Sequence, residues 1–454
     1  MPKWSVLQKL KENKVDEYKK TVSRRGKDPK IVDEFWSAYN EYLDLFRLYG
    51  KRKHELNVVS MQLSKNYSDE LRESAKKLKA EVNEIEKNMK NAKNKYIELS
   101  YKLPNLILPG VPDGIDEDDN VPIEYWGKPK VWSEYIDQFL EMTKGFDIDY
   151  EEISWKPAGH VDLLEDILKM GNTQQAARVV GSRFYYLFDD ISWLDFALSL
   201  FTIDFLTKKG FKFVIPPYMV RWDVIKAALD HETFLDMIYK IENEDLYLIG
   251  TAEHPLLALY IDRLIEEDEL PLKFIGWSPC FRKEAGSAGK DTKGIFRVHQ
   301  FHKIEQFVFC NPDIELSEKL FQEMVDNTKQ IWELLEIPYR VLNMCTGELA
   351  DQAARKYDIE VWYPAQCKYR ELASISNCLD WQAYRGPIHF RLKETGKLEY
   401  PFTLNGTGLP TSRAICAILE NYQQEDGTVI VPKVLKKYLE PFEMAPKDII
   451  SPSN

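Results

Sequence analysis

Two series of apolar residues near the N-terminus limit the fold most strongly. Their spacings alternate between three and four residues over 32–49 and again over 71–99. A sustained seam of this kind predicts long helices that pack against a partner helix. We therefore expect residues 1–103 to form a helical arm. The first series is Val32, Phe35, Tyr39, Tyr42, Phe46 and Tyr49, and the second is Leu71, Ala75, Leu78, Val82, Ile85, Met89, Ala92, Tyr96 and Leu99.

The segment between the two series decides how the arm folds. Turn-forming residues occur at Gly50 and at 66–69, so the chain can reverse at either place. One helix cannot bury its own seam, which favours an antiparallel hairpin with a second helix of about 29 residues, roughly 40 Å long. A coiled coil that only joins two subunits is the alternative. Basic residues are concentrated near the expected tip: Lys51, Arg52, Lys53, Lys65, Arg72, Lys76, Lys77 and Lys79.

Composition places the chain among globular proteins. It has 454 residues, 44% of them hydrophobic, which is enough for two or three domains. No apolar run is long enough to cross a membrane and the first residues lack the features of a signal peptide, so we expect a cytoplasmic protein without membrane contact. A net charge of −12 argues against a general affinity for nucleic acid. DNA is therefore not an expected partner, and any RNA contact must be local.

The cysteines indicate the redox state of the chain, and a stretch rich in proline and glycine indicates a domain boundary. Six cysteines are scattered through apolar segments without a CxxC pair, so we expect reduced thiols and no zinc. Residues 104–120 contain several prolines, glycines and acidic residues, which predicts a linker. A second domain then covers residues 121–454.

The second domain shows strand-like and helix-like runs without a regular βαβ repeat. Strands are expected at 247–255, 272–281 and 305–310, and helices at 193–210 and 413–423. No GxGxxG or GxxxxGK[ST] motif follows a strand, so neither a Rossmann nor a P-loop fold is supported. An α+β domain on an antiparallel sheet fits the pattern better.

Residues 281–309 read as two strands joined by a loop of glycines and lysines. Period-two alternation puts Arg282 and Glu284 on one face, and it puts Arg297, Phe301 and Glu305 on one face of the return strand. Arginine matches phosphate oxygens bidentately, and an aromatic ring offers a stacking plane for a base. This face therefore predicts an ATP platform. The opposite face holds Phe296, Val298, Ile304 and Val308, and the loop contributes Gly286, Gly289, Lys290, Lys293 and Gly294, a composition suited to phosphates.

Two stretches of this segment, FRKEAG and FRVHQFHKIEQF, resemble motif 2 of the class II aminoacyl-tRNA synthetases, and specifically that of seryl-tRNA synthetases of the archaeal type. The resemblance implies the class II fold, an antiparallel sheet flanked by helices, with an antiparallel coiled-coil arm that binds tRNA and with 121–454 as the catalytic domain. It also implies ATP, L-serine and tRNA(Ser) as partners, and a homodimer whose interface motif ends near Pro216 and Pro217. The resemblance continues through GSRFYYLF (181–188), VIPPYMV (214–220), TAEHP (251–255), ELASISNCLDWQA (371–383) and LNGTGLPTSRAICAILENYQ (404–423).

The resemblance assigns roles to individual residues. Arg282 and Arg413 are the catalytic arginines, and Glu371 with Ser374 holds Mg²⁺ on the ATP phosphates, where oxygen ligands suit a hard cation. A spacing of three places these two on one face only if the strand is irregular. The serine site is Thr251, Ala252, Glu253, Arg282, Glu305, Asn405 and Thr407. The ATP site is Arg282, Lys283, Glu284, Arg297, Val298, Phe301, Glu371, Leu372, Ala373, Ser374 and Arg413.

Some positions depart from the family pattern. Gly250, Tyr384, Gly408 and Pro410 replace commoner residues, and none is expected to touch an assigned ligand contact. Two other functions stay open at this point. A non-catalytic relative predicts damage among the charged site residues, all of which are intact. A paralogue that loads serine onto a carrier protein would usually lack the arm, which this chain retains.

Overall fold

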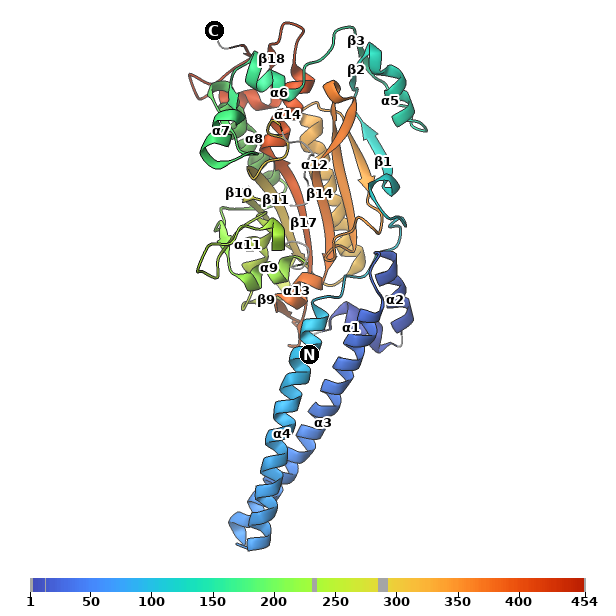
Figure 1. Ribbon diagram of the computed structural model, residues 1–454, viewed down its shortest axis with the longest axis vertical. Coiled ribbons are helices and arrows are strands. Elements are labelled where there is room, and N and C mark those ends of the chain that lie inside the picture. The colour runs from blue at the N-terminus through green and yellow to red at the C-terminus, as the bar shows by residue number, and fades with distance from the viewer. Residues whose placement is uncertain (1–2, 13, 231–234, 285–292, 453–454) are drawn as a thin grey trace. The chain divides into compact units, whose positions relative to one another are not determined.

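The computed structural model describes residues 3–12, 14–230, 235–284 and 293–452, and the chain divides into two compact units over these ranges. One unit is Val6–Leu106. The other combines Met1–Ser5 with Ile107–Asn454. Each unit is described separately below (Figure 1).

The first unit contains a helical hairpin. Its two long helices, α3 and α4, lie side by side in Figure 1. The chain reverses after Lys65, and Gly50 lies inside α3, so the earlier of the two possible turns is not used. A single glycine costs a helix about 1 kcal/mol, which a long helix packed against a partner tolerates. The helices of this region are α1 (Ser5–Lys11), α2 (Val15–Arg24), α3 (Lys30–Lys65) and α4 (Asp69–Ser100).

The hairpin is held at one end by a cluster of aromatic rings. Tyr96 of α4 packs against Phe35, Tyr39 and Tyr42 of α3, with ring centroids 6.5, 5.5 and 5.0 Å away. Phe46 belongs to the same series but is 52% exposed, so the predicted seam does not stay buried along its whole length.

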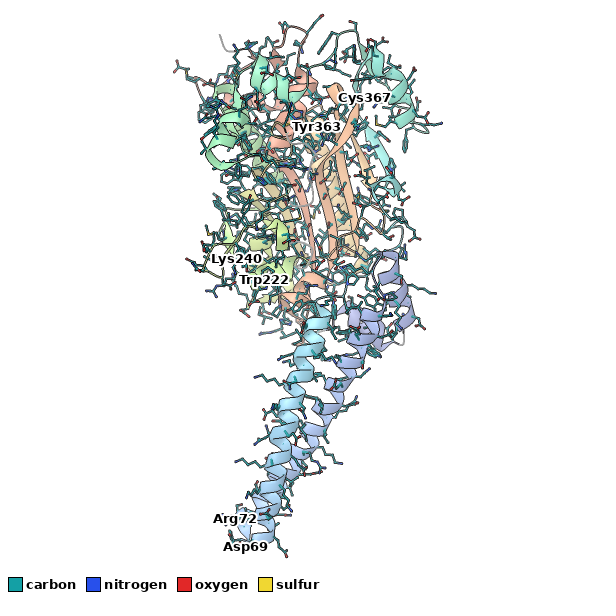
Figure 2. All side chains as sticks on the ribbon, viewed as in Figure 1. Asp69, Arg72, Trp222, Lys240, Tyr363 and Cys367 are labelled. Atoms are coloured by element: carbon teal, nitrogen blue, oxygen red, sulfur yellow. The ribbon has the colours of Figure 1, made fainter. Side chains whose placement is uncertain are left out.

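The other end of the hairpin is polar. The hydroxyl of Tyr67 donates to Asp69 Oδ1 at 3.1 Å and accepts from Arg72 Nη1 at 3.4 Å, across the turn into α4. Figure 2 labels Asp69 and Arg72 in the first turn of this helix. Farther along, Arg52 of α3 lies 3.5 Å from Glu81 of α4. The arm is therefore apolar at its start and charged toward its tip.

The second unit is built on an eight-stranded sheet in the described part of the chain. Within this eight-stranded sheet, as far as the structure describes it, the strands pair antiparallel except that β6 runs parallel to β10. This confirms the prediction of an α+β domain on an antiparallel sheet. In spatial order the strands are β1 (Val121–Trp126), β12 (Tyr339–Asn343), β13 (Arg355–Tyr363), β14 (Lys368–Leu379), β17 (Phe402–Pro410), β11 (Gln300–Cys310), β10 (Leu272–Phe281) and β6 (Lys212–Val214).

Helices cover the sheet and fix its faces. Helix α12 (Ile314–Leu334) packs on one face, where Asn327 Nδ2 donates to Gln306 Oε1 at 3.0 Å. The opposite face of β11 is left for the residues that alternate with Gln306. The other main helices are α8 (Asp189–Lys208), α9 (Trp222–Ala228), α11 (Glu253–Ala258), α13 (Trp381–Arg385) and α14 (Thr411–Tyr422), so the two helices predicted from sequence are confirmed.

Short elements complete this unit. The strands are β2 (Lys130–Trp132), β3 (Glu151–Ile153), β4 (Gly171–Asn172), β5 (Tyr186–Leu187), β7 (Met219–Val220), β8 (Tyr247–Leu248), β9 (Leu264–Glu266), β15 (His389–Arg391), β16 (Leu398–Glu399), β18 (Val429–Ile430) and β19 (Ile449–Ile450). The helices are α5 (Ile136–Met142), α6 (His160–Asp162), α7 (Thr173–Val180) and α15 (Lys436–Leu439).

Two local predictions are wrong. The strand expected at 247–255 is only β8, and Glu253 instead begins helix α11. An acidic residue and a nearby proline both suit the first turn of a helix, which explains the change. Strand β10 ends at Phe281 and β11 begins at Gln300, so Arg282, Glu284 and Arg297 lie outside regular strands. The predicted loop residues Gly286, Gly289 and Lys290 lie outside the described residues.

The predictions about cysteines and membranes can also be compared with the structure. All six cysteines are buried and free, which confirms the expected thiols. Among the described residues, no helix combines the length and the apolar character needed to cross a membrane.

We predict that Tyr96→Ala destabilises the helical hairpin by about 3 kcal/mol, because it removes the ring on which three aromatic side chains of α3 pack. Urea unfolding of the full chain, followed by its helical circular dichroism, measures this. Tyr67→Ala is the matched control, since Tyr67 is 69% exposed and its loss should change stability by less than about 0.5 kcal/mol. Equal effects of the two substitutions would contradict the aromatic cluster as the main anchor.

Candidate active site

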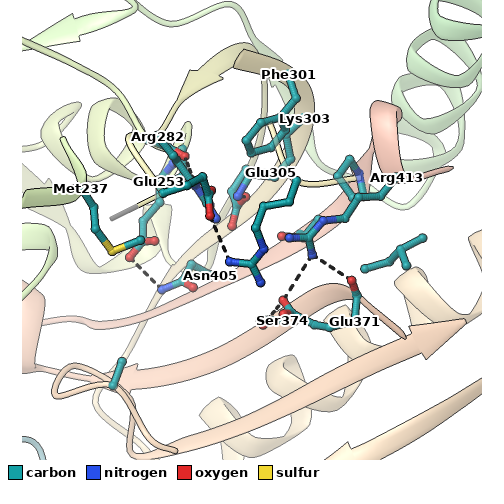
Figure 3. Close-up of a pocket in the computed structure, with 18 of the residues that line it drawn as sticks. Met237, Glu253, Arg282, Phe301, Lys303, Glu305, Glu371, Ser374, Asn405 and Arg413 are labelled. Atoms are coloured by element: carbon teal, nitrogen blue, oxygen red, sulfur yellow. Dashed lines mark hydrogen bonds and ion pairs between the residues drawn. The ribbon is translucent and has the colours of Figure 1, made fainter. Parts of the chain in front are cut away.

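A pocket of about 290 Å³ opens on the face of the sheet opposite α12. Figure 3 shows side chains from separate elements pointing into it. Helix α11 supplies Glu253, and the segment after β10 supplies Arg282. Further walls come from β11 (Phe301, Lys303, Glu305), β14 (Glu371, Ser374), β17 (Asn405, Thr407) and the start of α14 (Arg413). The structure therefore brings most of the sequence-predicted site residues into one cavity.

Three predicted residues do not line the pocket. Ala252 packs on Gly276 of β10. A Cβ built on this glycine would lie 2.7 Å from the Cβ of Ala252. The ammonium of Lys283 lies 5.7 Å from the ring of Tyr239 instead. Ala373 pairs with Ile359 on the neighbouring strand and is buried. These residues can contribute only through the backbone or by packing.

The deep end of the pocket contains Glu253. Its Oε1 accepts hydrogen bonds from Gln382 Nε2 at 2.6 Å and from Asn405 Nδ2 at 3.0 Å. Thr251 Oγ1 accepts from the backbone N–H of Glu253 at 3.3 Å, which orients this first turn of α11. Burial, and then the charge of Glu305, raises the pKa of Glu253 to about 7. The pocket thus holds a carboxyl group that is ready to change its charge near neutral pH.

Beside Glu253 lies a buried ion pair between Lys303 and Glu305. Their side chains are 6% and 3% exposed. Glu305 faces Gly276 on β10 and Thr407 on β17 in the strand register, which aligns it with the polar side chains of β17. This end of the pocket offers paired donors and acceptors to a small polar ligand.

Arg282 occupies the centre of the pocket. Its Nε donates to the carbonyl oxygen of Gly250 at 3.1 Å, and its guanidinium carbon lies 5.3 Å from the centre of the Phe301 ring. Its backbone N–H donates to His299 at 2.9 Å. The expectation that Gly250 touches no assigned ligand contact is therefore wrong, because its carbonyl helps to hold Arg282.

Glu284 and Arg297 face each other across the next part of the pocket. Arg297 Nη1 lies 3.0 Å from Glu284 Oε2, and Glu284 has a positive φ of 51°. The predicted period-two faces hold for Phe301 and Glu305, which lie on β11, but not for these two residues. Phe296 and Val298 were predicted to face away, yet both line the pocket with Arg297. Irregular backbone lets consecutive side chains reach the same cavity.

Arg413 is the third residue of α14, so its charge lies near the positive end of the helix dipole. Its Nε donates to the carbonyl oxygen of Phe296 at 3.2 Å and its Nη1 to that of Glu371 at 2.8 Å. The guanidinium carbon lies 4.9 Å from the Phe296 ring centre. These contacts hold the guanidinium at the pocket wall (Figure 3).

A β-bulge brings Glu371 and Ser374 together. Glu371 pairs with Glu360 while Ala373 pairs with Ile359, so Leu372 is an extra residue on β14. As a result Ser374 Oγ donates to Glu371 Oε1 at 3.3 Å. The irregularity required by their spacing is therefore present.

Charges around this bulge favour an ionised carboxylate. Burial acts to raise the pKa of Glu371, but Arg413, Lys356 and Arg282 outweigh it and hold the pKa below its usual range. A carboxylate and a hydroxyl oxygen suit Mg²⁺. Among the described residues, no group of three or more His, Cys, Asp or Glu side chains is placed to bind a metal. Any further ligands would have to come from a bound molecule such as a polyphosphate.

Comparison with known proteins agrees with this geometry. The family model for the tRNA synthetase class II core domain (G, H, P, S and T) matches residues 238–422, and that for the seryl-tRNA synthetase N-terminal domain matches 7–107. A serine–tRNA ligase of Hyperthermus butylicus is 50% identical over 99% of this chain and 98% of its own, and one of Ignicoccus hospitalis is 51% identical over 99% of each. The chain belongs to the seryl-tRNA synthetase family.

Solved structures extend the family likeness. A seryl-tRNA synthetase from Pyrococcus horikoshii complexed with ATP is 46% identical, with a TM-score of 0.92 over 99% of both chains. A cytoplasmic serine–tRNA ligase from Naegleria fowleri in complex with AMP is 31% identical, with a TM-score of 0.82 over 98% of this chain and 97% of that one. The resemblance drawn from the sequence motifs, and the class II fold that it implied, are confirmed.

Family motifs did not reveal several side chains of the pocket. Lys303 is one, although period-two alternation on the strand that contains Glu305 could have identified it. His254 is another: it is 1% exposed, and neither ring nitrogen has a hydrogen-bond partner among the described residues. Burial, and then the charges of Lys303 and Arg282, lowers the pKa of His254 to about 3, so the ring is neutral. Phe296 and Lys356 also line the pocket.

The raised pKa of Glu253 predicts that the stability of the fold depends on pH. Its pKa rises from 4.5 to about 7 on folding, so the protonated form stabilises the fold, and this stabilisation is lost as pH rises from about 4.5 through 7. We expect Glu253→Gln to raise the free energy of unfolding at pH 8 by about 3 kcal/mol without ligand, which stabilises the fold, and to change it little at pH 4.5.

Denaturant unfolding of both proteins at the two pH values measures this difference. Glu394→Gln, at an exposed position, is the control and should leave the pH dependence unchanged. A Glu253→Gln variant with the same pH dependence as the parent chain would show that the carboxyl group is not destabilised by its site.

Proposed function

We propose that this chain joins L-serine to ATP to give seryl-adenylate and then transfers serine to the 3′ end of tRNA(Ser). One observation carries the proposal. A polar end suited to a small amino acid, with Glu253 and Glu305, shares a cavity with arginines suited to phosphates. The sequence identity to serine–tRNA ligases over nearly the whole chain supports the same reaction.

In the first step a carboxylate oxygen of serine attacks the α-phosphorus of ATP, the bond to the bridging oxygen breaks and pyrophosphate leaves. Two anions must meet, so a fixed cation between them lowers the barrier. Arg282 supplies it, because its guanidinium is anchored to Gly250 and Phe301 between the two ends of the pocket. No side chain is needed as a base, since the nucleophile is already ionised.

ATP is proposed to lie along the wall from Phe301 to Arg413. Phe301 offers a face to the base, and Glu284 accepts from the adenine amino group. Arg297 and Arg413 receive the outer phosphates, for which arginine is well suited. Lys283, Val298, Leu372 and Ala373 contribute through backbone or packing contacts.

Magnesium is proposed to bind with ATP at Glu371 and Ser374. The bulge at Leu372 brings the two side-chain oxygens within 3.3 Å, and Arg413, Lys356 and Arg282 favour the ionised carboxylate. The ion would neutralise charge on the phosphates as they separate. The protein's own part is to hold the two oxygens on one face of β14.

Serine is proposed to bind at the deep end. Glu253, with Thr251 and the backbone of Ala252, receives the ammonium group, while Glu305, Asn405 and Thr407 surround the hydroxyl. Alanine would leave these buried polar groups unsatisfied, which costs far more than one lost contact. Threonine must be rejected by lack of space. For the second step, we propose that the leaving AMP phosphate accepts the proton of the tRNA hydroxyl.

The arm, residues 1–103, is proposed to contact tRNA(Ser), with 104–120 as the linker to the catalytic domain 121–454. The family match to the N-terminal domain supports this role, and the basic residues toward the tip of α3 and α4 suit an RNA backbone. DNA and membranes are not proposed as partners. The cytoplasm, where tRNAs are charged for translation, is the proposed location.

We propose a homodimer whose subunit interface is formed by α8 and β6. Phe196 and Leu200 lie one turn apart on α8 and are 61% and 44% exposed, while Phe213 and Ile215 at the sheet edge are 40% and 63% exposed. The opposite side of α8 is buried, so this helix is apolar on two sides, as expected where a second layer covers it.

Serine-dependent exchange of pyrophosphate into ATP, followed by charging of tRNA(Ser), tests the activity. Both are expected. Absence of exchange excludes the enzymatic proposal and favours a non-catalytic relative. Exchange without charging favours the paralogue that loads a carrier protein.

We predict that Glu305→Ala lowers kcat/KM for serine in this exchange by at least about 100-fold, because a hydrogen bond from the serine hydroxyl to a charged acceptor is lost. The fold should be retained, as checked by circular dichroism. Glu323→Ala is the control, since Glu323 of α12 pairs with Lys273 of β10 but does not line the pocket. Unchanged serine activation in Glu305→Ala would refute the assigned role.

We also predict that Phe196→Asp combined with Leu200→Asp shifts the protein from dimer to monomer, because two charges would be buried at the proposed interface. Light scattering during size-exclusion chromatography measures the mass. Leu140→Asp, at a 50% exposed site on α5, is the control and should leave the mass unchanged. A dimer that persists in the double variant would place the interface elsewhere.

A further inference from the structure

The lysine at the deep end of the pocket has no role in the proposed function. Lys303 and Glu305 are neighbours on the same face of β11, and their side chains are 6% and 3% exposed. In the strand register Lys303 faces Ser278 of β10 and Pro410 of β17, neither of which carries a charge. A buried ammonium is costly unless it is paired, so its contact with Glu305 Oε2 is the reason it can occupy this site.

Several ionisable groups surround the pair of Lys303 and Glu305, and they come from α11, β10, the segment after β10 and β14. Glu253 and His254 lie on α11, and Arg282 follows β10. Cys280 of β10 and Cys378 of β14 complete the set, and burial raises the pKa of both thiols, which keeps them neutral. Among these described residues two carboxylates, Glu253 and Glu305, are balanced by Arg282 and Lys303. With both carboxylates ionised, the serine end therefore carries no net charge before an amino-acid zwitterion binds.

Charge balance matters because the negative charges of Glu253 and Glu305 repel each other. The charge of Glu305 raises the pKa of Glu253, while the charges of Lys303 and Arg282 act to lower it. Arg282 is already held by the carbonyl of Gly250 and is proposed to meet the two reacting anions. Lys303 is then the cation that remains with the carboxylates when substrate binds.

We propose that Lys303 is a positioning residue for amino-acid binding: it holds Oε2 of Glu305 and balances the paired carboxylates, so that the other oxygen of Glu305 and the carboxylate of Glu253 can receive the hydroxyl and the ammonium of serine. This inference rests on the proposed function. It assigns the accuracy of serine recognition partly to a side chain that need not touch serine.

The consequence of losing Lys303 depends on pH. The pKa of Glu253 is about 7 with Lys303 present, and Lys303 is one of the charges that lower it, so without this cation Glu253 stays protonated to higher pH. The protonated site then lacks an acceptor for the serine ammonium or hydroxyl. Raising the pH removes the proton and should restore binding.

Lys303→Met and Lys303→Arg test this, with KM for serine and for ATP measured by pyrophosphate exchange between pH 6 and pH 8.5. In Lys303→Met we expect KM for serine to rise about 100-fold at pH 7 and to recover by about 10-fold at pH 8.5, with KM for ATP within about twofold of the parent. Lys303→Arg should keep the pH profile of the parent chain. Lys273→Met is the matched control, because it breaks a lysine–glutamate pair between β10 and α12 outside the pocket.

Three results would overturn the inference. They are an unchanged KM for serine in Lys303→Met, an equal rise at every pH, which marks a merely structural role, and a parallel rise in KM for ATP. If Lys303→Met does not fold, Lys303→Gln at the same pH values gives the same distinction. Failure of the proposed function is separate, since the parent chain would then show no serine-dependent exchange at all.

Discussion

The register of β11 is the constraint on which the pocket depends. Gln306 is fully buried and fixes it from the side of α12: its Nε2 donates to Thr328 Oγ1 at 3.1 Å, and its Oε1 accepts from Asn327 at 3.0 Å. Thr328 Oγ1 in turn donates to the carbonyl oxygen of Thr407 at 3.0 Å, which ties β17 to the same helix. If β11 slipped by one residue, Glu305 would be buried against α12 and the amide of Gln306 would leave its partners on this helix. The buried network therefore aims the charged face of β11 into the pocket.

Regular structure supplies the floor of the site, and breaks in regular structure supply its walls. Glu253 is placed by the start of a helix, Glu371 by a bulge, and Glu284 by a residue with positive φ. Each break turns a side chain that a continuous strand would direct elsewhere. This explains how carboxylates far apart in sequence converge on one cavity of about 290 Å³.

The contrast between regular strands and breaks in them also explains which parts of the site the sequence could predict. Period-two alternation identified β10 and the face of β11 that carries Phe301 and Glu305, because a sheet buried on one side enforces that pattern. It failed for Arg297, where irregular backbone replaces the strand, and for Glu253, where a helix begins whose neighbouring residues Ala252 and Leu256 pack on Gly276. Family motifs recovered most site residues but assigned no role to Lys303. Alternation places this residue on the pocket face, and the fold adds that its charge is buried against Glu305.

The departures from the family pattern follow the same physical logic. Gly250 contributes a carbonyl, which any residue could supply, and a Cβ there would meet its nearest atom at 3.7 Å, so the change is tolerated. Gly408 differs, because a Cβ would lie 3.1 Å from Leu206 of α8 and 3.2 Å from the carbonyl oxygen of Ile304. A larger residue would push α8 away from the sheet. The exposed side of α8 is the proposed subunit interface, so this glycine connects the packing of β17, which carries Asn405 and Thr407, to the helix that a second subunit would cover.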